Sequence, residues 1–171
     1  EWERGTLEAL LVTPASMSEV LLGKLAAYFA LGTGGMLLTV GLAVWLFDVP
    51  LRGSFWVLWA CSSLFLLAAL GMGLTISTLA RSQFVAGQVA IIATFLPAFL
   101  LSGFIFDIGS MPTVVQWITH VIVARYFVAI VHTVFLAGDV WSVILPNAAA
   151  LVLLAAIFLA ITWRKSRKRL D

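Results

Sequence analysis

Four long apolar stretches follow one short polar segment along this chain. The apolar stretches run about from residue 25 to 47, 55 to 79, 84 to 104 and 141 to 163. A helix needs about 20 predominantly apolar residues to cross about 30 Å of hydrocarbon. Each stretch is long enough, so the pattern predicts an all-α, polytopic membrane protein with four transmembrane helices. The first two connections are short, which predicts that consecutive spans are antiparallel neighbours.

The composition supports a membrane protein and excludes an ordinary soluble domain. The 171 residues are 63% hydrophobic and 11% charged, with a mean hydropathy of +1.11. Soluble domains are nearer one half apolar and about one quarter charged. The net charge is +2, but half of the basic residues form one cluster at 164–169, directly after the last apolar stretch. Such a cluster is typical of a membrane flank, so the charge does not indicate a nucleic-acid partner.

Lysine and arginine are unequally divided between the two ends of the predicted spans. With the N-terminus in the cytoplasm, eight of them fall on the cytoplasmic side and two on the outer side. Basic residues are retained in the cytoplasm, whereas acidic residues matter little. We therefore expect both ends of this chain to be cytoplasmic. The eight are Arg4, Lys24, Arg81, Arg164, Lys165, Arg167, Lys168 and Arg169, and the two are Arg52 and Arg125.

The polar segment at the start of the chain predicts a short helix. Thr6 is placed to cap it, and Glu8 falls in its first turn, where a carboxylate opposes the positive end of the helix dipole. Leu7, Leu10 and Leu11 lie on one face of that helix.

Pro14 marks the end of this short helix, because proline restricts the residue before it and cannot donate to the next turn. Ser16 and Glu19 then form a capping box, which starts the next helix at once. The expected result is a short helix, a sharp corner and a membrane entry. Taken by itself, the segment fits a solvated linker with one helical turn equally well.

Between the third and fourth spans lies an apolar segment, residues 114–136, that resembles a fifth span but contains three ionisable residues. These are His120, Arg125 and His132. A central arginine costs about 2.5 to 3.5 kcal/mol on insertion scales, against about 0.3 to 0.6 gained per good apolar residue. This sum does not forbid a span.

Topology argues against that fifth crossing, because it would place the C-terminal basic cluster outside. We therefore predict that residues 107–138 form an outer re-entrant helical hairpin, which dips into the outer leaflet and returns. Gly109 and Pro112 are expected to make its corner.

Small residues and proline mark where the spans can pack or bend. In a membrane, glycines permit the close backbone approach on which helix association depends, so they predict packing seams. Pro97 removes one hydrogen bond from the third span and is expected to kink it. The glycines are Gly32, Gly34, Gly35 and Gly41 in the first span and Gly71 and Gly73 in the second.

Tryptophans lie near the predicted ends of the spans. Such positions are typical of aromatic belts at the membrane interface, whereas a substrate cage would need several of them to converge on one cavity. We therefore interpret them as anchors. Four fall near the outer ends and one near the inner end of the last span, namely Trp45, Trp56, Trp59, Trp141 and Trp163.

The residues with catalytic or metal-binding potential are few. The single cysteine, Cys61, excludes an internal disulfide and a multi-cysteine zinc site. His120 and His132, with Asp107 and Asp139 in the same outer region, lack the spacing of a usual zinc motif, so interfacial histidines are the preferred interpretation. Arg125 is the best polar candidate for a transport path, although an arginine that reaches the head groups explains it equally well.

No catalytic set and no cofactor are indicated. The chain has no Gly-rich loop ending in Lys-Ser or Lys-Thr, so ATP binding has to belong to another polypeptide or to a further domain. Paired catalytic acids and a serine, histidine and carboxylate set are also lacking. The sequence therefore indicates a protein that is not itself an enzyme.

Three motifs in order resemble the type-2 export permeases of the ATP-binding-cassette (ABC) transporters. The run ERGTLEALLVTP follows the family pattern E-x-G-T-x-E-x-L-x-x-T-P and is followed by SEVLLGK. The runs SGFIFDIGSMPTVVQW and RYFVAIVHTVFLAG resemble the outward-side re-entrant motifs. Val123 departs from the pattern, because many members have proline there. The first motif is matched by Glu3, Gly5, Thr6, Glu8, Leu10, Thr13, Pro14, Glu19, Gly23 and Lys24.

The resemblance implies one transmembrane permease domain over residues 1–171, the C-terminal part of a longer membrane subunit with six spans. The expected parts are a cytoplasmic coupling segment, three spans, an outer re-entrant segment, a last span and a basic tail. Their ranges are 1–24, 25–104, 105–140, 141–163 and 164–171. The fold class is thus all-α, with four transmembrane helices, a short cytoplasmic coupling helix and an outer re-entrant hairpin.

The function that the resemblance implies is that of the membrane-spanning permease of an ATP-driven exporter in the inner (plasma) membrane. A separate ABC ATPase subunit and a second permease subunit are the expected partners. The first segment is expected to dock on the ATPase, whereas the sequence assigns no residue to the substrate path. The expected coupling residues are Glu3, Arg4, Thr6, Glu8, Leu10, Leu11 and Pro14.

Two other classes remain as alternatives. A secondary transporter half would be expected to place ionisable groups at the midplane, and the four predicted spans have none there. A membrane scaffold protein that needs no ATPase is compatible with the pattern. A polytopic membrane enzyme would need a polar cluster at an interface, for which the outer region offers only two histidines and the aspartates.

Overall fold

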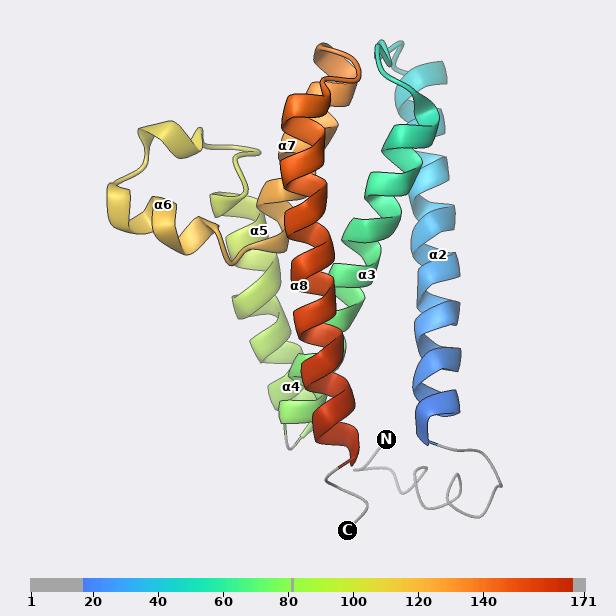
Figure 1. Cartoon of the computed structure of the whole chain (residues 1–171), viewed down its shortest axis with the longest axis vertical. Helices are drawn as coiled ribbons and strands as arrows, with labels where there is room; N and C mark the ends of the chain where they lie inside the picture. The colour runs from blue at the N-terminus through green and yellow to red at the C-terminus, as the bar shows by residue number, and fades with distance from the viewer. Residues whose placement is uncertain (1–16, 81, 168–171) are drawn as a thin grey trace.

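The computed structural model of this chain describes residues 17–80 and 82–167, and within these ranges it is helical without strands (Figure 1). Three of the four spans are single continuous helices. The other one, third along the chain, is built from three consecutive helical pieces. The long helices are α2 (Met17–Trp45), α3 (Phe55–Leu79) and α8 (Trp141–Arg167). The third span consists of α4 (Gln83–Ala90), the π-helix η1 (Ile91–Phe95) and α5 (Leu96–Leu101).

The four predicted spans are confirmed as helices. Those long and apolar enough to cross a membrane are Glu19–Trp45, Phe55–Leu79, Gln83–Leu101 and Trp141–Arg164. The first helix begins at Met17, earlier than the predicted start of the span near residue 25. Glu19 lies in its first turn, where a carboxylate is favourable, and Lys24 does not interrupt it because a lysine near a helix end can extend toward the head groups. Ser16 lies outside the described residues.

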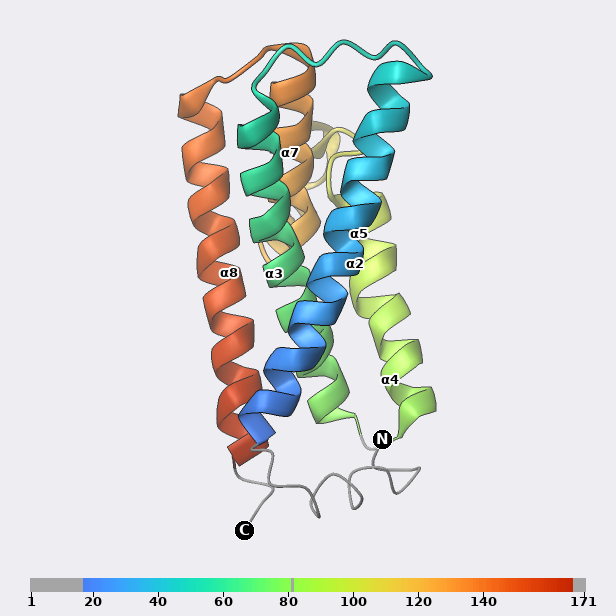
Figure 2. The same ribbon diagram turned by 90° about the vertical axis from the view of Figure 1, so that its right-hand side faces the viewer.

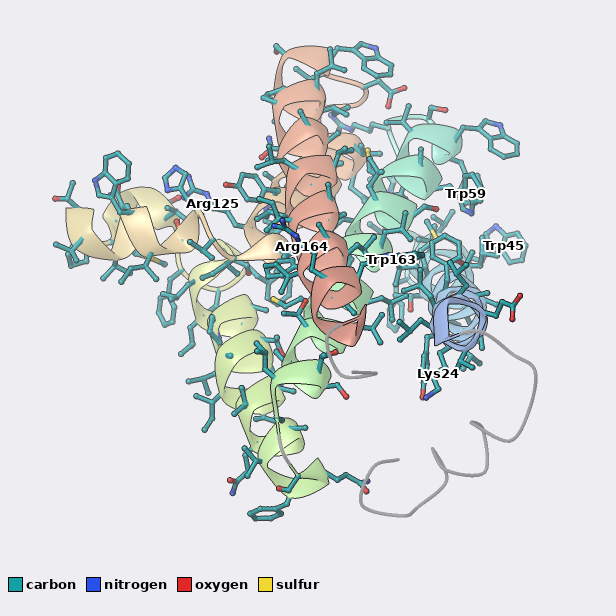
Figure 3. The ribbon with its side chains drawn as sticks, turned by 60° about the horizontal axis from the view of Figure 1, so that its bottom comes forward. Lys24, Trp45, Trp59, Arg125, Trp163 and Arg164 are labelled. Atoms are coloured by element: carbon teal, nitrogen blue, oxygen red, sulfur yellow. The ribbon has the colours of Figure 1, made fainter. Side chains whose placement is uncertain are left out.

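Helix α2 begins and α8 ends at the same end of the bundle, which we call the terminal end (Figure 1). The connection 46–54 and the connection 137–140 lie at the opposite end, which we call the far end (Figure 2). An even number of crossings follows, in agreement with four spans. Lys24 and Arg164 lie near the terminal end, as the view from that end shows (Figure 3).

The buried core lies where α3, α8 and a shorter helix, α7 (Val123–Leu136), pack together. Figures 1 and 2 show α7 beside the far halves of α3 and α8. Within the described residues, α2 and the third span contribute no fully buried side chain. These two elements therefore lie at the periphery and present apolar surface outward. The buried apolar residues are Leu58, Cys61, Ala68, Val123, Ile130, Val134, Ile144, Leu151 and Ala155.

Only some of the predicted glycine seams are present in the described part of the chain. A Cβ at Gly71 would lie 3.3 Å from Phe158 Cβ and from Leu159 Cγ of α8, so Gly71 allows α3 and α8 to approach closely. A Cβ at Gly32 would lie 2.6 Å from Leu66 Cδ2, which marks the contact between α2 and α3. Cβ atoms at the other four predicted positions, Gly34, Gly35, Gly41 and Gly73, would meet no atom within 4 Å. Within the described residues, these four glycines therefore form no contact between helices of this chain, and a packing role for them stays a prediction.

Before Pro97, which was predicted to kink the third span, the structure shows a local widening of the helix. Five residues before it, Ile91–Phe95, form a π-helix, and the N–H of Leu96 donates to the carbonyl oxygen of Ile91. Proline cannot donate a hydrogen bond and crowds the preceding turn, and a π-bulge is one way to accommodate such a defect. The Thr94 hydroxyl donates to the carbonyl oxygen of Ala90 and so supplies one further donor in this turn.

At the far end, two connections are joined by hydrogen bonds. The backbone N–H of Ser54, before α3, donates to both carboxylate oxygens of Asp139, at 2.9 and 3.0 Å. The N–H of Gly53 donates to the carbonyl oxygen of Val134 at 2.8 Å. The carboxylate thus lies at the N-terminus of α3, where the helix dipole favours a negative charge. Asp139 is therefore part of the framework that holds α3 beside α7 and α8.

Candidate functional site

The seven expected ATPase-coupling residues, Glu3, Arg4, Thr6, Glu8, Leu10, Leu11 and Pro14, lie outside the residues that the structure describes. The structure does place the element that follows them. Helix α2 continues without a break from Met17 to Trp45, across the whole length of the bundle. A displacement at its start would therefore be carried along a single rigid element.

The segment after α5 forms the bent arrangement expected of a re-entrant hairpin. A 3₁₀ turn, η2 (Ile108–Ser110), is followed by α6 (Thr113–Thr119) and then by α7. Helices α6 and α7 meet at 88°. Figure 1 shows α6 projecting sideways from the bundle near the end of α5, while α7 rises from there to the far end. The pair therefore does not form a straight fifth crossing.

This segment bends between α6 and α7, at residues 120–122, and the predicted corner residues, Gly109 and Pro112, lie earlier, in η2 and at the start of α6. Gly109 lies in η2, and Pro112 is the extended N-cap residue of α6 (φ −55°, ψ 145°). Those two residues start α6. Ile122 is extended (φ −86°, ψ 114°), which separates the two helices and lets the chain change direction.

Gln116 connects both halves of the re-entrant motif. Its side-chain Nε2 donates to the carbonyl oxygen of Met111 at 2.8 Å, across Pro112, which has no N–H of its own. Its backbone carbonyl oxygen accepts from the Arg125 guanidinium at 3.2 Å. The side chain of Gln116 thus holds the start of α6, and its backbone links α6 to α7, roles that sequence reasoning did not assign.

Arg125 stabilises the corner between α6 and α7 (Figure 3). Its guanidinium also donates to the hydroxyl of Thr119, and it lies 3.1 Å from His120 Nδ1. Tyr126 donates from its hydroxyl to the carbonyl oxygen of His120 at 2.8 Å. A cation near the carbonyl groups that end a helix is favourable because it opposes the negative end of the dipole. Arg125 thus has a structural role in addition to those considered from the sequence.

The histidines and aspartates considered for a metal site do not form one cluster; the three described below have different neighbours. His120 Nδ1 lies 2.9 Å from the carbonyl oxygen of Gln116, and Asp139 binds the N–H of Ser54. His132 lies about two turns further along α7 than Arg125 and belongs to the lining of an apolar cavity. In residues 17–80 and 82–167, no three histidine, cysteine or acidic side chains come together as metal ligands would.

An apolar cavity of about 630 Å³ lies between α2, α3 and α7, in the far half of the bundle. Phe65 of α3 and Phe127 of α7 stack in its wall, with ring centroids 4.3 Å apart. Val49 of the far-end connection also lines it. Sequence reasoning missed this cavity, because its lining comes from four parts of the chain, namely α2, the connection 46–54, α3 and α7. The lining comprises Met36, Thr39, Val40, Ala43, Val49, Leu58, Ser62, Phe65, Leu66, Phe127, Val131, His132, Phe135 and Leu136.

One hydroxyl in this lining has no hydrogen-bond partner. The side-chain oxygen of Ser62 is buried and unpaired in the described structure, and Ser62 itself is only 3% exposed. The next residue, Ser63, donates to the carbonyl oxygen of Trp59 one turn earlier, and Thr39 likewise donates to that of Gly35. Ser62 therefore departs from the usual way in which hydroxyls are satisfied in membrane helices.

Comparison with known proteins shows the family of this chain. Residues 1–136 match the ABC-2 type transporter family. The chain is 51% identical to the probable multidrug ABC transporter permease YbhS of Escherichia coli (strain K12) over 171 residues, all of this chain and 45% of that protein. It is 29% identical over 153 residues to the probable multidrug ABC transporter permease YbhR of the same strain, covering 85% of this chain and 40% of YbhR.

A third relative is the inner membrane transport permease YhhJ of Escherichia coli (strain K12), 28% identical over 170 residues, which are 98% of this chain and 45% of YhhJ. The chain thus spans less than half the length of these relatives. No solved structure matches it. The family match covers both the first segment and the re-entrant motif, and with the four membrane helices it assigns this chain to the membrane permeases of the ABC-2 type transporter family.

Proposed function

We propose that this chain is the C-terminal part of a permease subunit that exports its substrate at the expense of ATP hydrolysed on a separate ABC ATPase subunit. Two such permease subunits would form the substrate path, in the inner (plasma) membrane, with both ends of this chain in the cytoplasm. The family match over residues 1–136 is the observation that carries the proposal, because it includes the segment expected to dock on the ATPase. The relatives named as probable multidrug permeases support an export function.

The arrangement of helices supports a mechanical role for α2. It directly follows the coupling segment and lies at the periphery of the bundle. It contacts α3 at Gly32, on which the side chain of Leu66 packs. Closure of the ATPase subunits would push on residues 1–19 and tilt α2 against α3. The permease would then shift between an inward-facing and an outward-facing packing, each a pre-existing state whose population the ATPase changes.

Within the coupling segment, the proposal assigns different roles to charged and apolar residues. Glu3, Arg4 and Glu8 would make polar contacts with the ATPase, whereas Leu10 and Leu11 would pack in its cleft or on the membrane-proximal side. Thr6 and Pro14 would set the start and the end of the docking helix. A single exposed charge near a helix N-terminus contributes only about 0.3 to 1 kcal/mol to stability, but an unfavourable like-charge contact in an interface costs several kcal/mol.

The test compares transport with ATP hydrolysis in the full-length protein, reconstituted with its ATPase in vesicles. Glu8→Lys should leave expression and membrane insertion intact while hydrolysis no longer drives transport. Leu10→Asp should act in the same way and more severely. The matched control is Asp107→Lys, a charge reversal at an exposed residue after α5, which should leave both activities at the parent's level.

If both coupling variants transport and assemble like the parent, the first segment is only a linker and the ATPase contact lies elsewhere. If transport continues with an ATPase subunit that cannot hydrolyse ATP, the alternative of a secondary transporter holds instead. A membrane scaffold would show no transport in either case.

A further inference from the structure

Helix α6 is held against α7 by a small set of hydrogen bonds at the corner between them. It projects sideways from the bundle (Figure 1), and in the described structure Thr119 is its one fully buried residue. The Arg125 guanidinium of α7 donates to the Thr119 hydroxyl and to the backbone carbonyl oxygen of Gln116. The Tyr126 hydroxyl donates to the carbonyl oxygen of His120. The orientation of α6 therefore depends on these polar contacts more than on a packed apolar face.

His120 and Arg125 approach the same acceptor. Nδ1 of His120 lies 2.9 Å from the backbone carbonyl oxygen of Gln116, and Nη1 of Arg125 lies 3.2 Å from it. The two nitrogens are 3.1 Å apart. Figure 3 shows Arg125 at this corner. The three atoms form a triangle in which an imidazole and a guanidinium share one carbonyl group.

This triangle suits a neutral imidazole better than a charged one. A neutral ring carries one N–H, so its Nδ1 either donates to Gln116 or accepts from Arg125. A protonated ring only donates, and it adds a positive charge beside a guanidinium that keeps its own charge. Like charges this close repel each other. A positive charge is favourable at the C-terminal end of α6, but Arg125 already supplies it.

No negative charge offsets this repulsion within the described part of the chain. The titratable groups that contact His120 there are Arg125 and Tyr126 of α7, and on α6 its ring lies 5.8 Å from that of Trp117. No described acidic side chain forms an ion pair or a hydrogen bond with His120 or Arg125. Asp139, at the far end, binds the start of α3 instead. His120 is exposed in the described structure, so protons reach it.

We propose that protonation of His120 releases α6 from α7. The charged ring donates to the carbonyl oxygen of Gln116, the Arg125 guanidinium moves away from it, and α6 turns about the extended residue Ile122. Histidine side chains gain their proton between about pH 8 and pH 5, whereas arginine stays charged throughout. The angle of 88° between α6 and α7 therefore belongs to the neutral form and is lost as the pH falls. This property of the fold does not depend on the proposed export function.

The experiment measures the position of α6 at two pH values in the full-length protein, reconstituted in lipid nanodiscs and without other cysteines. Spin labels on cysteines at Val114 of α6 and Leu153 of α8, both exposed, give the distance between the helices by double electron–electron resonance. At pH 8 we expect one narrow distribution of distances. The population at a second distance should rise about fivefold or more between pH 8 and pH 5.

Two substitutions at His120 fix its charge. His120→Gln cannot gain a proton, so it should keep the distribution of pH 8 at both pH values. His120→Lys is already charged at pH 8 and should show the second distance there. The matched control is His132→Gln, which removes the other histidine of this chain and should leave the response to pH unchanged.

The parent protein decides the proposal even if a variant does not fold. Identical distributions at pH 8 and pH 5 in the parent would overturn it, and the same result is expected if the rest of the full-length protein covers His120. A response to pH that persists in His120→Gln would belong to another group and would also overturn it. Arg125→Gln, which removes the link between the helices, should show the second distance at both pH values. Because no transport is measured, failure of the export function would leave this test unaffected.

Discussion

The hydroxyl oxygens of Thr75 and Thr162 lie 3.0 Å apart, buried between α3 and α8. The Thr75 oxygen lies 2.9 Å from the carbonyl oxygen of Gly71 in its own helix and 3.0 Å from that of Phe158 in α8, so its one proton has an acceptor on either helix. The Thr162 hydroxyl lies 3.0 Å from the same carbonyl oxygen of Phe158. Gly71, one turn before Thr75, allows this close approach. In lipid, packing and such interhelical hydrogen bonds replace the hydrophobic driving force between helices. The pair therefore fixes the two helices that form most of the core.

Thr75→Val should destabilise the protein by about 0.5 to 1.5 kcal/mol, because interhelical hydrogen bonds in membranes contribute about 0.6 kcal/mol on average and at most about 1.7. The control is Thr78→Val, since the Thr78 hydroxyl bonds only to Leu74 of its own helix among the described residues. Its effect should stay within about 0.3 kcal/mol. Unfolding of the full-length protein in mixed micelles measures both, and equal effects would contradict the role of the pair.

Asp139→Ala should loosen the far end of the bundle. The substitution leaves the N–H of Ser54 without its acceptor at the start of α3, and the loss of such a cap costs about 0.5 to 2 kcal/mol. Asp107→Ala serves as the control, because it removes an exposed carboxylate elsewhere. Hydrogen exchange of the first turn of α3 should accelerate in the Asp139 variant alone; unchanged exchange would show that the carboxylate contributes nothing there.

Val123→Pro should be tolerated, although proline interior to a helix costs about 3 kcal/mol or more. Val123 is the first residue of α7, where proline is favourable, and Ile122 before it is already extended, as a residue before proline prefers. Val128→Pro, in the middle of α7, should strongly reduce folded protein. Size-exclusion chromatography and thermal stability of the two variants distinguish them, and comparable losses would show that the start of α7 differs from this description.

Arg125→Gln should open the corner between α6 and α7. It removes a charged donor from the carbonyl oxygen of Gln116 and from the hydroxyl of Thr119, and hydrogen bonds to charged groups contribute about 1.5 to 3 kcal/mol. Arg52→Gln, at an exposed position of the far-end connection, provides the control. Limited proteolysis or hydrogen exchange at residues 113–122 should increase for Arg125→Gln only. If instead transport falls while this segment stays protected, Arg125 acts on the substrate path.

The topology can be tested with single cysteines in a protein that lacks Cys61. Cysteines at Arg52 and Ala137 should react with an impermeant thiol reagent from outside, and one at Ser82 only from inside. Ala137 is preferable to Gly138, because the positive φ of 93° at Gly138 makes any side chain there unfavourable. Outside labelling at Ser82 would contradict four spans with both ends in the cytoplasm.

The sequence by itself determined the features that are set by local patterns of residues, namely the membrane spans, the bent segment after α5 and the family motifs. The length of an apolar stretch decides whether a helix can cross hydrocarbon, so the four spans followed from it with errors of only a few residues, apart from the earlier start of α2. The even number of crossings followed from the basic residues, and the bent pair after α5 followed from the ionisable residues inside an apolar segment. The motifs led to the family in the same way, because they are local patterns.

Only the tertiary structure decided which side chains meet between the helices. Lipid is as apolar as a helix interface, so a membrane helix carries little pattern that separates its lipid-facing side from its packed side. Gly71 packs against α8 whereas a Cβ at Gly73, two residues later, would meet nothing, and the Ser62 hydroxyl is buried without a partner whereas that of Ser63 bonds to its own helix. Such differences depend on the rotation of each helix toward its neighbours. The cavity, the Thr75–Thr162 pair and the role of Arg125 all arise from that rotation, which three-dimensional packing determines.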